Sequence, residues 1–267
     1  MIKKLSLLAL LVFFIGVIGS VVTYGSMNNK VSINEKKLIE NENITSIQID
    51  VDSTDVEFIT VRSMDEARVE LVGKSVENTI NDFSVKEEGE TLSISLQPEN
   101  SKWFNFKLYL PTLKLKIFAP EKMYNNVYVN GSSSDVNWQS LKAKSIEIST
   151  VSGDVHAEST HSEKMTVKTV SGDVYMERIQ GEIETVTVSG DVFISTSELS
   201  HSIYGKTTSG DIDIESVKEP TDIKFEVSTS SGDVNLFDKY NNNAKMGKGD
   251  VLIQLKTDSG DITATNK

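Results

Sequence analysis

Short runs in which apolar and polar residues alternate fill the chain after residue 43. Leu92, Ile94 and Leu96 form one such run, and Leu113, Leu115 and Ile117 form another. Side chains of a β-strand point alternately to its two faces, so this period of two predicts strands that are buried on one face. Only four prolines occur, and valine, isoleucine, threonine and serine are common. The pattern therefore predicts an all-β domain over residues 44–267.

The motif Ser-Gly-Asp occurs six times in the second half of the chain, at intervals of 19, 18, 20, 22 and 28 residues. Its glycines are Gly153, Gly172, Gly190, Gly210, Gly232 and Gly260. The residue seven positions before each glycine is always apolar, and the residue three positions before it is always threonine: Thr150, Thr169, Thr187, Thr207, Thr229 and Thr257. The residues two and four positions after each glycine are also apolar. Each motif therefore marks one structural repeat with a fixed set of inward positions.

The parity of the inward positions changes at Gly-Asp, from odd offsets before the glycine to even offsets after it. Such a change requires a bend in the chain, and glycine suits a corner with unusual backbone angles. Degenerate copies precede the series, one around Ser134-Asp135 and another that runs from Ile47 to Phe58. Regular coils are thus expected over residues 125–267, with the same geometry beginning near residue 44.

One repeat is too small to fold alone, whereas stacked copies let adjacent strands pair and align equivalent side chains. The near-constant interval favours a β-solenoid, similar to a β-helix, with coils of about 19–20 residues. A pair of packed antiparallel sheets is the alternative, although hairpins of varying length fit a fixed interval less well. The 28-residue interval predicts an inserted loop at 237–249. Only seven residues follow Gly260, so an uncapped last strand is expected, and self-association through its exposed edge is a hypothesis.

The N-terminal segment has the properties of a membrane anchor. Lys3 and Lys4 precede 18 uncharged residues, Leu5–Val22, which span roughly 27 Å as a helix. Lysines before the span place the N-terminus in the cytoplasm. We therefore expect a cytoplasmic stub at 1–4, a transmembrane signal anchor at 5–22, a polar stalk at 23–43 and an extracytoplasmic domain at 44–267. A cleaved secretory signal is the alternative, but an Ala-x-Ala-like site is absent.

Composition restricts the class of partner. The formal net charge of −12 disfavours nucleic acid. With no cysteine in the chain, there is no disulfide framework and no thiolate metal site. The expected partners are the membrane, through the N-terminal helix, and a protein or glycan of the cell envelope. No cofactor is expected.

The aspartate of each motif is the main candidate for chemistry. These residues are Asp154, Asp173, Asp191, Asp211, Asp233 and Asp261, and stacking would place them in one column. Gly/Asp repeats of some solenoids bind calcium, so the column is a candidate calcium site. Alternatively, aspartate occupies corners because its carboxylate bonds to nearby backbone amides. The structural interpretation is favoured, since the short glycine-rich nonapeptide of calcium β-rolls is absent.

Catalysis has little support in the sequence. His156, His161 and His201 occupy different offsets in their repeats, so they are not expected to form a ligand set or a triad. Trp103 and Tyr109 are candidates for an exposed carbohydrate platform. A glycan-processing enzyme would need acids that gather off the repeat in one groove, and none is evident.

The chain from about residue 44 to its end resembles the family of bacterial proteins named putative adhesins. The resemblance is carried by Thr-x-Ser-Gly-Asp-Val/Ile, by the segment Leu115-Lys116-Ile117-Phe118-Ala119-Pro120, and by the basic-flanked anchor. That family includes LiaG-like membrane proteins encoded beside envelope-stress genes in Gram-positive bacteria. The resemblance implies a β-helix-like domain and supplies no catalytic or binding residues. The sequence departs from the pattern at Ser134, where glycine is expected, and in the long last interval.

Together these features predict a non-enzymatic, membrane-anchored cell-surface protein that acts as an adhesin or scaffold, or as an accessory of the envelope-stress response. A calcium-dependent glycan-binding module is the alternative, and a β-helix enzyme that processes glycans is a further one.

Overall fold

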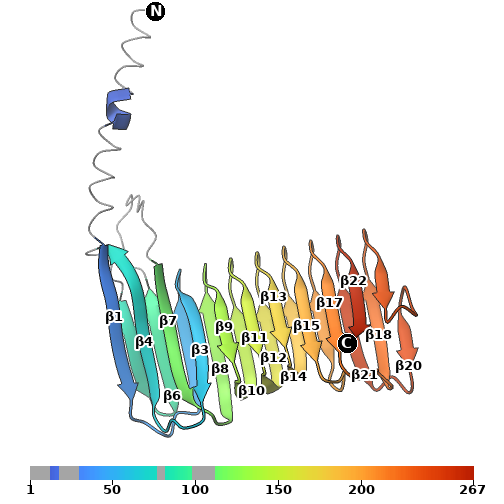
Figure 1. The fold of residues 1–267 in the computed structure, drawn as a ribbon, viewed down its shortest axis with the longest axis horizontal. Coiled ribbons are helices and arrows are strands. Elements are labelled where there is room, and N and C mark those ends of the chain that lie inside the picture. The colour runs from blue at the N-terminus through green and yellow to red at the C-terminus, as the bar shows by residue number, and fades with distance from the viewer. Residues whose placement is uncertain (1–12, 18–29, 77–81, 98–111) are drawn as a thin grey trace, which may run out of the picture.

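The computed structural model describes residues 13–17, 30–76, 82–97 and 112–267. It is an all-β solenoid in which the chain winds between two sheets of 11 strands each (Figure 1). Most neighbouring strands are parallel, which confirms the predicted solenoid and excludes a pair of antiparallel sheets. Among the described residues, no helix is long and apolar enough to cross a membrane. Most of the expected anchor, 5–22, lies outside the described residues.

Sheet A contains the strands that follow the Gly-Asp corners and, at one end, further strands from the less regular first half of the chain. In spatial order they are β1 (Lys30–Ile39), β4 (Ala67–Val76), β7 (Thr112–Pro120), β3 (Asp55–Val61), β9 (Val136–Gln139), β11 (Val155–Glu158), β13 (Val174–Glu177), β15 (Val192–Thr196), β17 (Ile212–Ser216), β22 (Ile262–Asn266) and β19 (Val234–Leu236).

Sheet B contains the strands that precede the corners and, at its two ends, further strands that do not belong to the repeat. In spatial order they are β20 (Ala244–Met246), β18 (Ile223–Ser228), β21 (Val251–Lys256), β16 (Ile203–Lys206), β14 (Gln180–Val186), β12 (His161–Lys168), β10 (Lys142–Ser149), β8 (Tyr124–Gly131), β2 (Ser46–Val51), β6 (Thr91–Gln97) and β5 (Asp82–Glu88).

The core lies between the two sheets and is built from the predicted inward positions. Seven residues before each glycine, Ile146, Met165, Ile183, Ile203, Phe225 and Ile253 are all buried. Four residues after it, Ala157, Met176, Ile194, Ile214, Leu236 and Ala264 are buried as well. Equivalent residues pair in register, as Ile146 does with Met165 and Val155 does with Val174. The alternation in the sequence thus corresponds directly to the burial in the structure.

The early degenerate copy is a true coil. Residues 46–61 form β2 and β3, which pair in parallel with β8 and β9 of the following regular coil. Ile47, Ile49, Val56 and Phe58 are buried in these strands. The prediction that the repeat geometry begins near residue 44 is therefore confirmed.

The coils at both ends of the solenoid do not stack in sequence order. The last coil of the chain, β21 and β22, lies between β16–β17 and β18–β19. At the other end, β2 and β3 lie between β6–β7 and β8–β9. The prediction of an uncapped last strand is wrong, because the 28-residue interval lets the chain return and insert its final coil inside the stack. The outermost strands at this end are the short β19 and β20.

Two segments differ from their expected roles. Residues 30–39, assigned to a stalk, form β1 and pair antiparallel with β4. Burial of Ile33 and Ile39 stabilises this strand, although polar residues separate them. The predicted insertion at 237–249 contains β20, which pairs antiparallel with β18. Both segments therefore add strands at the ends of the sheets.

Candidate functional site

The six Ser-Gly-Asp motifs stack at the corner that leads from sheet B to sheet A. Their serines pair from coil to coil, as in Ser152–Ser171 and Ser209–Ser259. A Cβ atom added to any of the six glycines would lie 2.0–2.1 Å from a backbone carbonyl oxygen of the adjacent coil. Four of the glycines also have a positive φ, for example 147° at Gly210. Close approach of the backbones is the requirement common to all six, whereas the expected unusual angles occur at four.

Ser134 stands where the motif has glycine, and the corner beside it is formed by Asp52 and Thr54. Its hydroxyl accepts a hydrogen bond from the Thr54 amide at 3.2 Å and donates one to the Asp52 carbonyl at 3.3 Å. Ser134 is fully buried. A small polar side chain therefore joins the first two corners, which lack glycine.

The aspartates form a continuous ladder along this corner. In every step one carboxylate oxygen accepts a hydrogen bond from the backbone amide of the aspartate in the next coil. The order of the ladder is Asp55, Asp135, Asp154, Asp173, Asp191, Asp211, Asp261 and Asp233, with N···O distances of 2.7–3.3 Å. The carboxylates thus satisfy amides at a corner where the sheet ladder is interrupted.

The threonines bond to the same corner from inside. Thr207, Thr257 and Thr229 donate their hydroxyls to the carbonyls of Gly190, Gly210 and Gly260 at 2.9–3.1 Å. Thr187 donates to the Gly172 carbonyl and Thr150 to the Ser134 carbonyl, both at the longer distance of 3.4 Å. Five of the six threonines are buried, and Thr229 is half-buried. Their hydroxyls therefore face inward, as the sequence predicts, and those of Thr187, Thr207, Thr257 and Thr229 bond to glycine carbonyls.

We expect Asp191→Ala to lower the free energy of unfolding by about 1–2 kcal/mol, because the Asp211 amide would lose its partner at 2.8 Å. Asp191→Asn keeps an oxygen that can accept this bond and removes one charge from the column, so its effect should be under about 0.5 kcal/mol. Urea denaturation of both variants measures the difference. An Asn variant as unstable as the Ala variant would contradict the structural role.

No group of three or more His, Asp or Glu side chains suited to a metal ion occurs within residues 13–17, 30–76, 82–97 and 112–267. In the ladder, one oxygen of each accepting carboxylate already bonds to a backbone amide. If calcium nevertheless bound to the ladder, added Ca²⁺ would raise the melting temperature of the wild type more than that of Asp191→Asn.

The three histidines lie apart. His156 is on β11 in sheet A, whereas His161 is on β12 in sheet B and contacts Gln180 at 2.8 Å. His201 follows β15 and contacts Ser200. The structure therefore does not bring them together. The predicted carbohydrate platform, Trp103 and Tyr109, lies outside the described residues.

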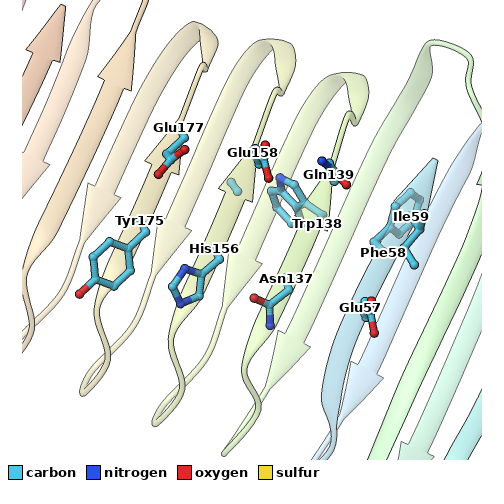
Figure 2. Close-up of a pocket in the computed structure, with 11 residues that line it drawn as sticks. Glu57, Phe58, Ile59, Asn137, Trp138, Gln139, His156, Glu158, Tyr175 and Glu177 are labelled. Atoms are coloured by element: carbon cyan, nitrogen blue, oxygen red, sulfur yellow. The ribbon is translucent and has the colours of Figure 1, made fainter. Parts of the chain in front are cut away.

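The outer face of sheet A contains a groove that crosses β3, β9, β11 and β13 (Figure 2). Its volume is about 340 Å³. The outward side chains along it come in pairs from successive strands: Glu57 and Ile59, Asn137 and Gln139, His156 and Glu158, and Tyr175 and Glu177. We call this the sheet A groove. It runs along the solenoid axis, across the strands.

Aromatic rings form one side of the sheet A groove. The imidazole of His156 stacks on the ring of Tyr175, with centroids 4.8 Å apart and planes 7° from parallel. The Tyr175 hydroxyl donates to Asp173 at 3.3 Å. The Asp173 carboxylate, together with smaller effects of burial and of this bond, raises the pKa of Tyr175, so the phenol remains protonated. The next residue in the row is Phe193 on β15, so three rings occupy consecutive coils.

Charges at the sheet A groove are paired. Arg178 bonds to both Glu158 and Glu177. Arg178 has φ 54° and directly follows β13, and the equivalent Ser159 has φ 53°. Glu57 pairs with Lys116 at 3.2 Å and with Lys114 at 3.9 Å. Three carboxylates thus lie near three cationic side chains, which leaves the groove polar and close to neutral.

The sheet A groove does not follow from the repeat pattern. The repeats share their inward residues, whereas the outward residues differ between coils. The sequence does contain a signal for it at the position three residues after the motif's glycine. In four successive coils this position is occupied by Asn137, His156, Tyr175 and Phe193. A small residue followed by three rings in consecutive coils indicates an outward aromatic row with a gap beside it.

Comparisons with solved structures give likenesses of low identity. A "putative adhesin" from Bacteroides fragilis is 15% identical with a TM-score of 0.47, over 88% of this chain and 97% of that chain. A "putative cell adhesion protein" from Clostridium sporogenes is 12% identical with a TM-score of 0.40, over 89% and 100%. A "putative lipid binding protein" from Parabacteroides distasonis is 16% identical with a TM-score of 0.39, over 87% and 96%. At these values the likenesses carry no functional argument.

Comparison with protein families gives a more direct result. No curated protein matches the sequence. The sequence profile described as Toastrack DUF4097 matches residues 119–265, which are more than half of the chain and include all six Ser-Gly-Asp motifs. The chain therefore belongs to the Toastrack DUF4097 family.

Proposed function

We propose that this chain is a non-enzymatic, membrane-anchored protein of the cell surface that presents a rigid β-solenoid as an adhesin or scaffold. The observation that carries this proposal is that the aspartates and threonines repeated in each coil form hydrogen bonds between coils. The aspartates bond to amides of the next coil, and most of the threonines bond to carbonyls of the preceding coil. Repeated acids and hydroxyls therefore support a structural role, and binding is left to the outer faces.

The anchor is the second part of the proposal. Leu5–Val22 contains no charged residue, and Lys3 and Lys4 precede it. A helix of this length just crosses a bilayer, and the lysines favour a cytoplasmic N-terminus. The solenoid then lies on the extracytoplasmic side. A role as an accessory of the envelope-stress response, as in the LiaG-like proteins that the sequence resembles, is compatible with this topology.

Protease accessibility in intact, wall-stripped cells tests the proposal. We expect added protease to degrade the solenoid while a cytoplasmic marker protein stays intact, and the untreated full-length chain to partition with membranes. A variant that lacks residues 5–22 should no longer partition with membranes. Protection of the membrane-bound wild type would contradict the topology, and with it the surface role.

A further inference from the structure

We propose that the sheet A groove binds a linear oligosaccharide that carries no negative charge. This inference deepens the proposed function, because a surface protein meets glycans, and it rests on that function for its biological setting. The binding itself depends only on the groove. Its shape, its ring face, its free amides and its charge balance each bear on the class of ligand.

The shape of the groove fits an elongated ligand. Its lining residues come from four adjacent strands, β3, β9, β11 and β13. Strands of a sheet are about 4.8 Å apart, so the groove extends over roughly 14 Å along the solenoid axis. Its direction is perpendicular to the strands, so a bound peptide could not extend the sheet by strand pairing there. A linear chain of pyranose rings can lie along such a groove.

His156 presents one free ring face to this groove. Its other face is covered by Tyr175 on β13, whereas β9 with Asn137 lies on the opposite side of β11 (Figure 2). Asn137 is smaller than the rings of His156 and Tyr175 and leaves a gap between His156 and Glu57 of β3. The apolar C–H face of a sugar ring can pack on this imidazole, as apolar groups do on aromatic rings.

Free amides supply hydrogen bonds along the groove. Neither side-chain amide of Asn137 or Gln139 has a partner within the described part of the chain. Each amide offers two donors and one acceptor oxygen. Sugar hydroxyls both donate and accept, so a saccharide matches these groups. Asn137 is half-buried and Gln139 is exposed, which leaves both accessible.

The charges select against ionic ligands. Glu158 and Glu177 share Arg178, and Glu57 lies near Lys116 and Lys114, so the three carboxylates are matched by three cations. A basic peptide would have to displace these partners. A polyanion would meet carboxylates in the groove of a chain with a net charge of −12. Uncharged hydroxyls, in contrast, can bond to carboxylates whose charge is already balanced.

Titration calorimetry of the full-length chain in a zwitterionic detergent without sugar head groups tests this proposal. The probes are cellotetraose and chitotetraose, with tetragalacturonate and tetralysine as charged comparisons. We expect at least one neutral tetrasaccharide to bind and both charged probes to bind at least about tenfold more weakly. His156→Ala should weaken the binding about tenfold because the free ring face is lost.

Two further variants make the result specific to this groove. Asn137→Trp places a large ring in the gap and should abolish binding, while His161→Ala makes the same change as His156→Ala on sheet B and should leave binding unaltered. Failure of both neutral probes to bind, preferential binding of a charged probe, or undiminished binding by Asn137→Trp would overturn the proposal. None of these results depends on topology, so they are distinguishable from failure of the protease experiment.

Discussion

Gly210→Ala is expected to destabilise the solenoid by about 3–5 kcal/mol, the range of severe single substitutions. The added Cβ would lie 2.1 Å from the Gly190 carbonyl oxygen, and Gly210 has φ 147°, which alanine rarely adopts. Relief would require adjacent coils to separate, and that would disturb the aspartate and threonine bonds at the same corner. Urea denaturation followed by circular dichroism measures the change in the free energy of unfolding.

Gly89→Ala is the matched control for this substitution. Gly89 also has a positive φ, 62°, but a Cβ added there would meet no atom within 4 Å. The control therefore measures the cost of a positive φ without a clash against a neighbouring coil, about 1 kcal/mol. If Gly210→Ala were no more damaging than Gly89→Ala, close packing between coils would not be the reason for the repeated glycine.

Removal of residues 251–267 is expected to destabilise the C-terminal end by more than about 5 kcal/mol. This truncation deletes β21 and β22, which lie between the coil of β16 and β17 and the coil of β18 and β19. Four buried apolar side chains are lost, Ile253, Leu255, Ile262 and Ala264. The coil of β18 and β19 would then have no parallel neighbour. Denaturation and limited proteolysis with mass spectrometry measure the effect, with new cleavage expected within residues 217–250.

A shorter truncation at the same terminus provides the control. Thr265, Asn266 and Lys267 are exposed, so their removal should cost about 1 kcal/mol or less. Wild-type stability after loss of residues 251–267, together with protection of residues 223–236, would contradict the inserted position of the last coil.

The regular coils were predictable because their information is local. A fixed set of inward positions, such as Ile146 and Ile148 before the corner and Val155 and Ala157 after it, defines both strands of one coil. The copy at Ile47 and Phe58 was recognisable by the same rule. Alternation and parity are properties of a single coil, so one sequence is enough to reveal them.

The order of the coils was not predictable in this way. Each Ser-Gly-Asp corner offers the same amides, carbonyls and carboxylate to a neighbouring coil. The bonds of Asp261 with Asp211 and Asp233 are therefore of the same kind as those between any two corners, and they do not specify which coils are neighbours. Only the 28-residue interval before Gly260 distinguishes the last coil. The strand β1 was missed because two buried isoleucines among polar residues are a weak pattern, and the sheet A groove because its residues do not repeat.

The inserted coils change how the solenoid would respond to a pulling force. In a stack that follows sequence order, the terminal coil has one neighbour and can peel away by breaking one ladder at a time. Here a pull on the C-terminus acts first on β22, which pairs with β17 on one side and β19 on the other. Two ladders must break together, while the outermost coil of β18 and β19 stays tethered to the chain at both ends. Tension applied through the C-terminus therefore meets its strongest resistance at the first step of unravelling.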